Sequence, residues 1–221
     1  MNHEIDRDGF AIFRDVVPET VRVGLLASLG PPAGAGRRGL LREPAVATLA
    51  QSENLLALVR PHVPAEPLPV RAIYFDKSPD ANWLVTWHQD LTLAVRARAE
   101  VLGFGPWSVK EGVPHVQSPV ELLERMLAVR LNLDDADEVN GALRVIPGSH
   151  LCGKLSATRI QEFRERSAEV ICSVLAGDAL LMRPLLLHAS SRSHLPRHRR
   201  VLHIEYAGFS LPDALEWYEA N

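Results

Sequence analysis

Strand-like segments separated by turn residues dominate the chain from Pro69 onward, and this pattern restricts the fold more than any other feature. The segments lie at 70–76, 83–95, 127–135, 142–150, 179–189 and 200–208. Gly, Pro, Asn and Asp lie between them, and these residues favour turns. Many short strands that follow a helical section predict a mainly β fold with flanking helices, either a sandwich or a barrel with helices packed on one side.

The N-terminal part of the chain has a different pattern. "GFAIFRDVV" (9–17) predicts one short strand, and Pro18 then stands where the first residue of a helix is favourable. Apolar residues at helical spacing predict a helix that ends at Gly30. Residues 44–60 also read as helical. This section is therefore expected to supply helices that pack against the strands that follow.

The length and composition set broad limits on the protein. With 221 residues, 47% of them apolar, the chain fits one domain with one large core. We predict a single domain over 1–221, with an N-terminal helical section over about 1–68 and a β core over about 69–210. The net charge of −3 gives no reason to expect nucleic acid or an anionic membrane surface as a partner.

Targeting features are also absent from the sequence pattern. No apolar run approaches the roughly 18 residues that span a bilayer, and "MNHEIDRDGFAIF" lacks the apolar core of a signal peptide. Cys152 and Cys172 form no disulfide framework and are expected to be reduced. We expect a cytoplasmic protein that acts on a small molecule, without nucleic acid or membrane partners. The oligomeric state is left open.

Two predicted loops have unusual composition or length. "PPAGAGRRG" (31–39) is either a mobile lid or a plain linker. The segment 96–119 is long and irregular, and such loops in compact domains are usually functional or disordered. Its aromatic and apolar content favours a functional loop. Both segments are candidates for a lid over a binding site.

The segment "TWHQDLTLAV" (86–95) places a histidine and an aspartate two residues apart in a predicted strand. Along a strand, alternate side chains point to the same face, so His88 and Asp90 would share one cavity while Gln89 points away. Together with one distant histidine they would form the 2-His-1-carboxylate triad of non-haem Fe(II) oxygenases. His188 is the candidate for the third ligand, because it ends a strongly apolar segment where small polar residues begin.

The pair alone is not specific, because the chain contains a second copy in His203 and Glu205. A surface pair, or a core histidine bonded to a backbone carbonyl, would give the same pattern. The second copy has no downstream histidine to complete a triad. We therefore predict that His203 and Glu205 line the pocket rather than bind the metal.

Arginines begin the last predicted strand, in "PRHRRVLHIEYA". An oxygenase that uses 2-oxoglutarate must hold a dianion, and a guanidinium binds the distal carboxylate through two hydrogen bonds. Arg199 shares a strand face with His203 and Glu205, whereas Arg200 shares one with apolar residues. The more polar face should line the cavity, so Arg199 is favoured and Arg200 is the alternative. Either arginine would otherwise be a solvated residue at a sheet edge.

The strand 127–135 alternates in the same way. Leucines and a valine occupy one face, and Arg130 and Asn132 lie on the other. If the apolar face packs against helices, Arg130 and Asn132 point into the barrel and can reach cosubstrate or substrate. "NGALRVIPGSH" (140–150) reads as a turn, a strand and a second turn. Its last residue, His150, is included in the possible substrate pocket.

The motifs taken in order resemble one known family. "WHQD", "LDDADEVNGALRVIPGSH", "LLLHASSRS" and "RRVLHIEYA" are similar to the phytanoyl-CoA dioxygenase (PhyH) family of Fe(II)/2-oxoglutarate-dependent oxygenases. The chain looks most like the short bacterial members of that family, and "DGFAIFRDVVPETV" is similar to the family's opening strand and helix. The resemblance covers about 8–208.

The resemblance implies a double-stranded β-helix, which is a cupin-like jelly roll, with the metal at its open end. It implies His88, Asp90 and His188 as iron ligands and Arg199 as the partner of the distal carboxylate of 2-oxoglutarate. It also places Ser190, Gln89 and Trp107 around the cosubstrate, and we add Asn132 to this group. The possible substrate pocket then contains Arg130, His150, His203 and Glu205.

The function implied is hydroxylation of an aliphatic C–H bond in a small molecule, with Fe(II), 2-oxoglutarate and O₂ as cofactor and cosubstrates and succinate and CO₂ as products. Two alternatives keep the metal ligands: a non-oxidative, cupin-like metal-binding protein and a zinc-dependent hydrolase. Neither alternative requires an arginine eleven residues after the distal histidine, or Ser190. The sequence does not identify the substrate.

Overall fold

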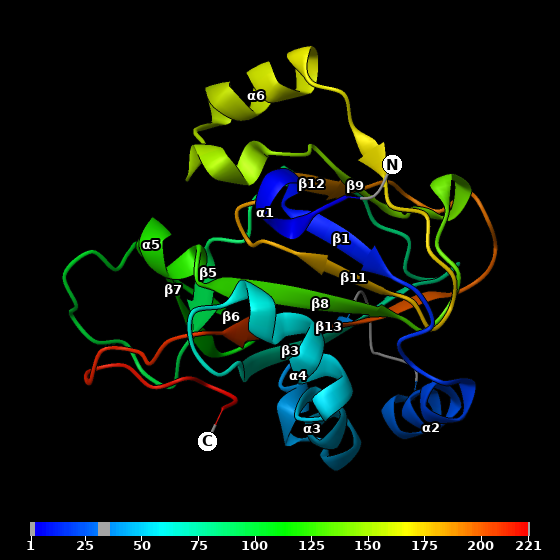
Figure 1. The fold of residues 1–221 in the computed structure, drawn as a ribbon, viewed down its shortest axis with the longest axis horizontal. Coiled ribbons are helices and arrows are strands. Elements are labelled where there is room, and N and C mark those ends of the chain that lie inside the picture. Colours follow the sequence, from blue (N-terminus) through cyan, green and yellow to red (C-terminus); the bar gives the residue numbers. More distant parts are fainter. Residues whose placement is uncertain (1–2, 31–35, 221) are drawn as a thin grey trace.

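A computed structural model describes residues 3–30 and 36–220, and antiparallel sheets form its centre (Figure 1). The major sheet has the strand order β1-β11-β8-β13-β3-β2 and the minor sheet β10-β9-β12-β4, while β5-β7-β6 form a third, small sheet. The major-sheet strands are β1 (Phe10–Phe13), β2 (Gly36–Arg37), β3 (Leu68–Lys77), β8 (Met126–Asn132), β11 (Ala179–Met182) and β13 (Arg199–Ala207). The minor sheet contains β4 (Val85–His88), β9 (Leu143–Val145), β10 (Val170–Ile171) and β12 (His188–Ser190).

This arrangement confirms the predicted mainly β fold, a jelly roll of the cupin-like type with flanking helices. The helices are α1 (Ile5–Asp8), α2 (Glu19–Leu29), α3 (Pro44–Ala50), α4 (Glu53–Val59), α5 (Val120–Leu123) and α6 (Ala157–Arg166). Short 3₁₀ helices lie at Leu40–Arg42, Arg60–His62, Glu138–Asn140 and Ser149–Cys152. Among the helices of the described ranges, none has the length and hydropathy needed to cross a membrane.

Helices α2, α3 and α4 cover one face of the major sheet, and α6 lies on the opposite side of the molecule (Figure 1). Leu25, Val46 and Leu55 of these helices share a buried apolar cluster with residues of β8 and β13. The Tyr206 hydroxyl of β13 donates a hydrogen bond of 2.9 Å to the carbonyl of Ala50 at the end of α3. The main core therefore lies between the helices and the sheet.

Alternation along β8 and β13 decides which side chains enter the barrel. In β8, Leu127, Val129 and Leu131 belong to the core under the helices, as do Leu202, Ile204 and Tyr206 in β13. The other face carries Arg130 on β8 and Arg199, His203 and Glu205 on β13, and all four side chains line an internal cavity. The apolar face of β8 thus packs as the sequence analysis required for Arg130 to point inward.

Two predicted strands are each divided in the structure. The segment 83–95 forms β4 and β5 (Thr92–Ala94), with Gln89 to Leu91 between them. The segment 179–189 forms β11 and β12, and Pro184, which has no N–H to donate to a strand, lies between those two. The Asp90 N–H donates to the Pro184 carbonyl at 2.9 Å, so the two irregular connections hold each other.

The interpretation of 96–119 as one irregular loop was wrong. It contains a hairpin of β6 (Trp107–Lys110) and β7 (Val113–Gln117), and β7 also pairs with β5. The turn residues Glu111 and Gly112 both have positive φ angles, of 52° and 79°. In the other candidate lid, 31–35 lie outside the described residues, and Gly36 and Arg37 form β2 against β3.

Candidate metal centre

Three side chains meet where β4 and β12 lie side by side. His88 ends β4, His188 begins β12, and the two are direct cross-strand partners with ring centroids 4.2 Å apart. Asp90 follows β4 by two residues, and its two carboxylate oxygens lie 3.8 Å from His88 Nε2 and 3.6 Å from His188 Nε2. One potential ligand atom from each residue lies within 4.8 Å of the other two.

The backbone orients both imidazole rings. His88 Nδ1 lies 2.8 Å from the Thr86 carbonyl, and His188 Nδ1 lies 2.8 Å from the Leu186 carbonyl. A carbonyl only accepts hydrogen bonds, so each Nδ1 carries the proton and donates, and each Nε2 presents a lone pair. Hydrogen bonding of this kind orients histidines that bind metals and fixes their tautomer.

The protonation states also suit metal binding. Burial lowers the pKa of His188, and the neighbouring carboxylate of Asp90 offsets this only in part, so the ring stays neutral. Burial raises the pKa of Asp90, but the surrounding cationic groups, which are His188 and His88 when protonated, His203 when protonated and Arg71, lower it by more, so the net direction is downward and the carboxylate stays ionised. Neutral imidazole and ionised carboxylate are the states that bind a divalent metal.

The donor set therefore fits a divalent cation. Two imidazole nitrogens and one carboxylate oxygen on one side match the facial triad of Fe(II) oxygenases, which leaves coordination positions open. The His188 side chain is 5% exposed, whereas those of His88 and Asp90 are 40% and 39% exposed and face the cavity. The open side is where a cosubstrate would approach.

The three residues lie at the wall of a cavity of about 210 Å³. Eight residues singled out from the sequence line it: His88, Asp90, Arg130, His188, Ser190, Arg199, His203 and Glu205. The sequence analysis did not find several others, among them Arg38, Arg71, Phe75, Trp83 and Lys110. Arg71, Ile73 and Phe75 alternate along β3, so strand periodicity could have indicated this second wall.

One end of the cavity concentrates buried positive charge. Arg199 is 3% exposed, and its Nε has no hydrogen-bond partner in the described structure. Lys77, the cross-strand partner of Arg199, donates from Nζ to Ser190 Oγ at 2.6 Å. Burial, followed by repulsion from Arg199, lowers the pKa of Lys77 to about 7. This end therefore has unsatisfied capacity for an anion.

Lys77 was missed because it lies one residue beyond the predicted strand 70–76. The alternation Arg71, Ile73, Phe75 extends to it once β3 is known to end at Lys77. Ser190 Oγ in turn donates to the Gly141 carbonyl at 2.8 Å. The cation and the hydroxyl are thus held together beside Arg199.

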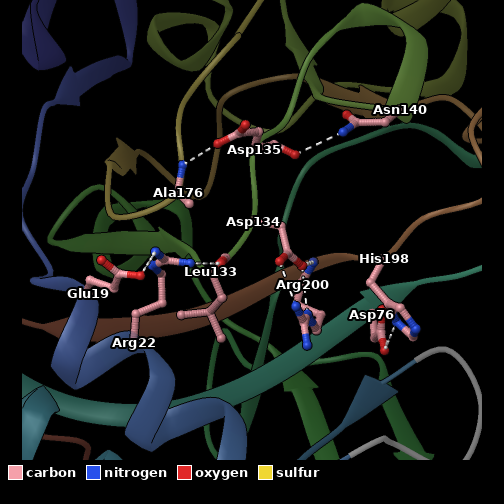
Figure 2. Close-up of polar contacts among 10 residues, drawn as sticks. All are labelled: Glu19, Arg22, Asp76, Leu133, Asp134, Asp135, Asn140, Ala176, His198 and Arg200. Carbon is pink, nitrogen blue, oxygen red and sulfur yellow. Dashed lines mark hydrogen bonds and ion pairs between the residues drawn. The ribbon is translucent and has the colours of Figure 1, made fainter.

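Arg200 points away from this cavity. It forms a bidentate pair with Asp134, with both nitrogen–oxygen distances at 2.7 Å (Figure 2). Figure 2 also shows the neighbouring contact of His198 with Asp76 on the same side. The geometry thus favours Arg199 over Arg200 as a partner for an anion inside the barrel.

Four predicted site residues do not line the cavity, and their expected positions are corrected. The Gln89 amide donates to the Leu185 and Gly153 carbonyls, because its side chain lies on the far side of the connection from Asp90. The Asn132 amide lies 3.3 Å from the Arg130 carbonyl and 3.4 Å from the Asp178 carbonyl.

The other two corrections concern Trp107 and His150. Trp107 belongs to the β6–β7 hairpin and packs against an apolar cluster, with Arg98 stacked on its ring. His150 lies in a 3₁₀ helix, where Nε2 is 3.2 Å from the Asp6 carbonyl and the ring packs against Gly9. It lines a separate surface pocket with Arg183 and Leu185.

A double-stranded β-helix with a 2-His-1-carboxylate cluster and a buried arginine in one cavity defines the class of Fe(II)/2-oxoglutarate-dependent oxygenases. The family model for phytanoyl-CoA dioxygenase (PhyH) matches residues 5–201. The chain belongs to this family, as its motifs predicted, and it is an enzyme of the Fe(II)/2-oxoglutarate oxygenase superfamily. No sequence among the curated proteins matches it.

Solved structures of low sequence identity share the fold. AviO1 from Streptomyces viridochromogenes Tue57 is 23% identical, with a TM-score of 0.67 over 95% of this chain and 94% of that one. HygX from Streptomyces hygroscopicus, solved with nickel and 2-oxoglutarate, is 18% identical, with a TM-score of 0.66 over 95% and 86%. The 2-oxoglutarate-dependent epimerase SnoN from nogalamycin biosynthesis is 17% identical, with a TM-score of 0.66 over 91% and 78%.

Proposed function

We propose that this enzyme is an Fe(II)- and 2-oxoglutarate-dependent dioxygenase that hydroxylates an aliphatic C–H bond of a small molecule. Succinate and CO₂ are the co-products. His88, Asp90 and His188 hold the iron, and Arg199 binds the distal carboxylate of 2-oxoglutarate next to Ser190, whose hydroxyl joins Lys77 to the Gly141 carbonyl. Arg130, His203 and Glu205 line the part of the cavity where the substrate lies.

One observation carries this proposal: the metal-ligand cluster and the buried, incompletely paired Arg199 line the same cavity. An unpaired buried guanidinium is unfavourable, and a carboxylate from the cosubstrate would compensate for it. A metal-binding protein without a cosubstrate, or a zinc hydrolase, has no use for this group. Lys77, opposite Arg199, donates to Ser190 Oγ and to the Ser191 carbonyl and so fixes that end of the site.

The protein's own residues orient the reactants and exclude water. The carbonyls of Thr86 and Leu186 fix the His88 and His188 rings, so both Nε2 atoms are held in place to bind a metal at the cavity wall. When bound, iron with 2-oxoglutarate and O₂ supplies the oxidising chemistry. The apolar side chains of Ile73, Phe75 and Val85 line the same cavity and limit the access of water.

Spectroscopy and product analysis test the proposal. Anaerobic addition of Fe(II) and 2-oxoglutarate to the full chain should give the weak visible charge-transfer band of a chelated 2-oxo acid. A screen of small molecules for stimulated succinate release should then find substrates whose product gains one oxygen atom. If iron is bound and no band forms, the oxygenase proposal is wrong. A product of unchanged elemental composition would instead indicate a reaction such as epimerisation.

A further inference from the structure

The cavity holds two separate groups of positive charge. The inner cluster consists of Arg130 and Arg199, with Lys77 buried opposite Arg199 but outside the cavity lining, and the outer cluster consists of Arg38, Arg71 and Lys110. The two groups of charge also differ in which pKa they lower. Burial is the main cause of the lowered pKa of Lys77, and repulsion from Arg199 and Arg130 adds to it. Burial is likewise the main cause for Lys110, and repulsion from Arg71 and Arg38 adds to it.

The register of β3 and β13 sets the distance between the clusters. Lys77 pairs with Arg199 at one end of the two strands, and Arg71 pairs with Glu205 at the other. Six residue steps at about 3.3 Å each separate the backbone of Arg71 from that of Lys77 by roughly 20 Å along the strand, and Arg130, opposite His203, lies between the two ends. At this backbone separation, a 2-oxoglutarate whose distal carboxylate pairs with Arg199 leaves Arg71 without a carboxylate from the cosubstrate.

The outer cluster is only partly neutralised by the protein. Arg71 donates to Glu205 at 3.1 Å, and Arg38 pairs with Glu111 at the tip of the β6–β7 hairpin. Lys110 Nζ lies 3.3 Å from the Thr92 hydroxyl, and its electrostatic contact with Asp90 would be weakened by a metal bound there. Arg38 Nε is buried without a partner in the described structure.

A charge count for the whole cavity leads to the same conclusion. Among the described residues that line it, five are cationic and two, Asp90 and Glu205, are anionic. A divalent metal and a doubly charged cosubstrate cancel each other, which leaves an excess of three positive charges. Glu111 at the hairpin tip removes one of these. The remaining excess favours a further anion in the cavity.

We propose that Arg38, Arg71 and Lys110 bind an anionic group of the substrate, a carboxylate or a phosphate. This inference rests on the proposed function and narrows it to acidic small molecules. Arg71 lies deepest, with a side chain 9% exposed, and Arg38 and Lys110 reach the cavity from β2's edge and from the hairpin. The anion would be held at the outer end, and the carbon chain would extend toward the metal ligands.

Calorimetric titration under anaerobic conditions tests the inference, with full-length protein saturated with Fe(II) and 2-oxoglutarate. The probes are matched pairs of four to eight carbons: alkanoates against alkanamides, and alkyl phosphates against alkanols. We expect at least one acid to bind tenfold or more tightly than its neutral counterpart. The acid that binds distinguishes carboxylate from phosphate. If no acid exceeds its neutral counterpart, the inference is wrong.

Four variants separate anion binding from a structural role. Arg38→Gln and Lys110→Gln should each weaken the preferred acid about 10- to 100-fold, the value of a hydrogen bond to a charged group. Arg96→Gln is the matched control, because Arg96 also pairs with a glutamate but lies outside the cavity, and affinity should stay within twofold. Glu111→Gln removes the partner of Arg38 and should leave acid binding equal or stronger.

Two further outcomes would overturn the inference. If Glu111→Gln weakens acid binding as much as Arg38→Gln does, the pair only holds the hairpin in place. If both cavity variants bind the acid as the wild type does, the anion lies elsewhere. The charge-transfer band, recorded on the same samples, separates the two proposals. A normal band without preference for acids would contradict only the proposal of an anionic substrate. Absence of the band would contradict the proposed oxygenase function as well.

Discussion

The chain contains two His-x-carboxylate pairs on neighbouring walls of one cavity, and their surroundings differ. His88 and Asp90 are 40% and 39% exposed, and the ring nitrogen that faces the carboxylate is free of backbone contacts. His203 and Glu205 are 4% and 11% exposed. Arg130 donates to His203 Nδ1 at 3.2 Å, and Arg71 donates to Glu205. The same motif is therefore open to a metal in one place and engaged by guanidinium groups in the other.

Cross-strand partners explain the difference. His88 lies opposite His188, so a second imidazole completes the cluster. His203 lies opposite Ile73 on one side and Arg130 on the other, and neither can serve as a metal ligand beside it. A His-x-carboxylate pair thus becomes a candidate metal site only through the strand that lies next to it.

The largest expected effect is on metal binding. Asp90→Ala removes the carboxylate of the cluster and should weaken Fe(II) binding more than about 100-fold. Loss of a residue that only hydrogen-bonds to a metal ligand costs about 10- to 100-fold in metal affinity, and loss of a ligand itself should cost more. Succinate formation and the charge-transfer band should disappear. Glu205→Ala, the matched change in the second pair, should alter Fe(II) affinity by no more than a few-fold. Metal titration of both variants measures this, and the reverse result would mean that the second pair is the ligand pair.

Stability of the metal-free protein should show the opposite order. Glu205→Ala leaves the guanidinium of Arg71 buried without its carboxylate, and breaking a buried ion pair in this way costs about 3 kcal/mol or more. Asp90→Ala removes a partly exposed carboxylate and should change the free energy of unfolding by less than about 1 kcal/mol. Urea denaturation of the metal-free variants gives both values. Equal losses would show that the two carboxylates have the same structural role.

A smaller effect is expected at the arginines that begin β13. Arg199→Gln should weaken 2-oxoglutarate binding about 10- to 100-fold, because a charge-assisted pair with the distal carboxylate is lost. Arg200→Gln should leave that affinity within about twofold and cost about 0.5–1 kcal/mol of stability through the loss of its pair with Asp134. Calorimetric titration of 2-oxoglutarate measures the first effect. Stronger loss in the Arg200 variant would reverse the assignment.

Strand periodicity predicted much of the site from the sequence. It placed Arg130, His203 and Glu205 on inward faces, because apolar residues alternate with them and pack under the helices, and Arg199 shares the face of His203 and Glu205. It also placed His88 and Asp90 in one cavity with Gln89 outside it, although the strand itself ends at His88. Asp90 reaches the cluster from an irregular connection, which the Pro184 carbonyl holds, rather than from a regular strand.

The sequence by itself determined the fold class, the family and the residue types that can hold a metal, because alternation and motif order are local properties of the chain. Only the tertiary structure decided which residues meet. The pairing of β12 with β4 brings His188 to His88, and the pairing of β3 with β13 brings Lys77 to Arg199 and Arg71 to Glu205. The β6–β7 hairpin adds Lys110. These contacts depend on strand register between segments far apart in the chain, and local patterns do not encode register.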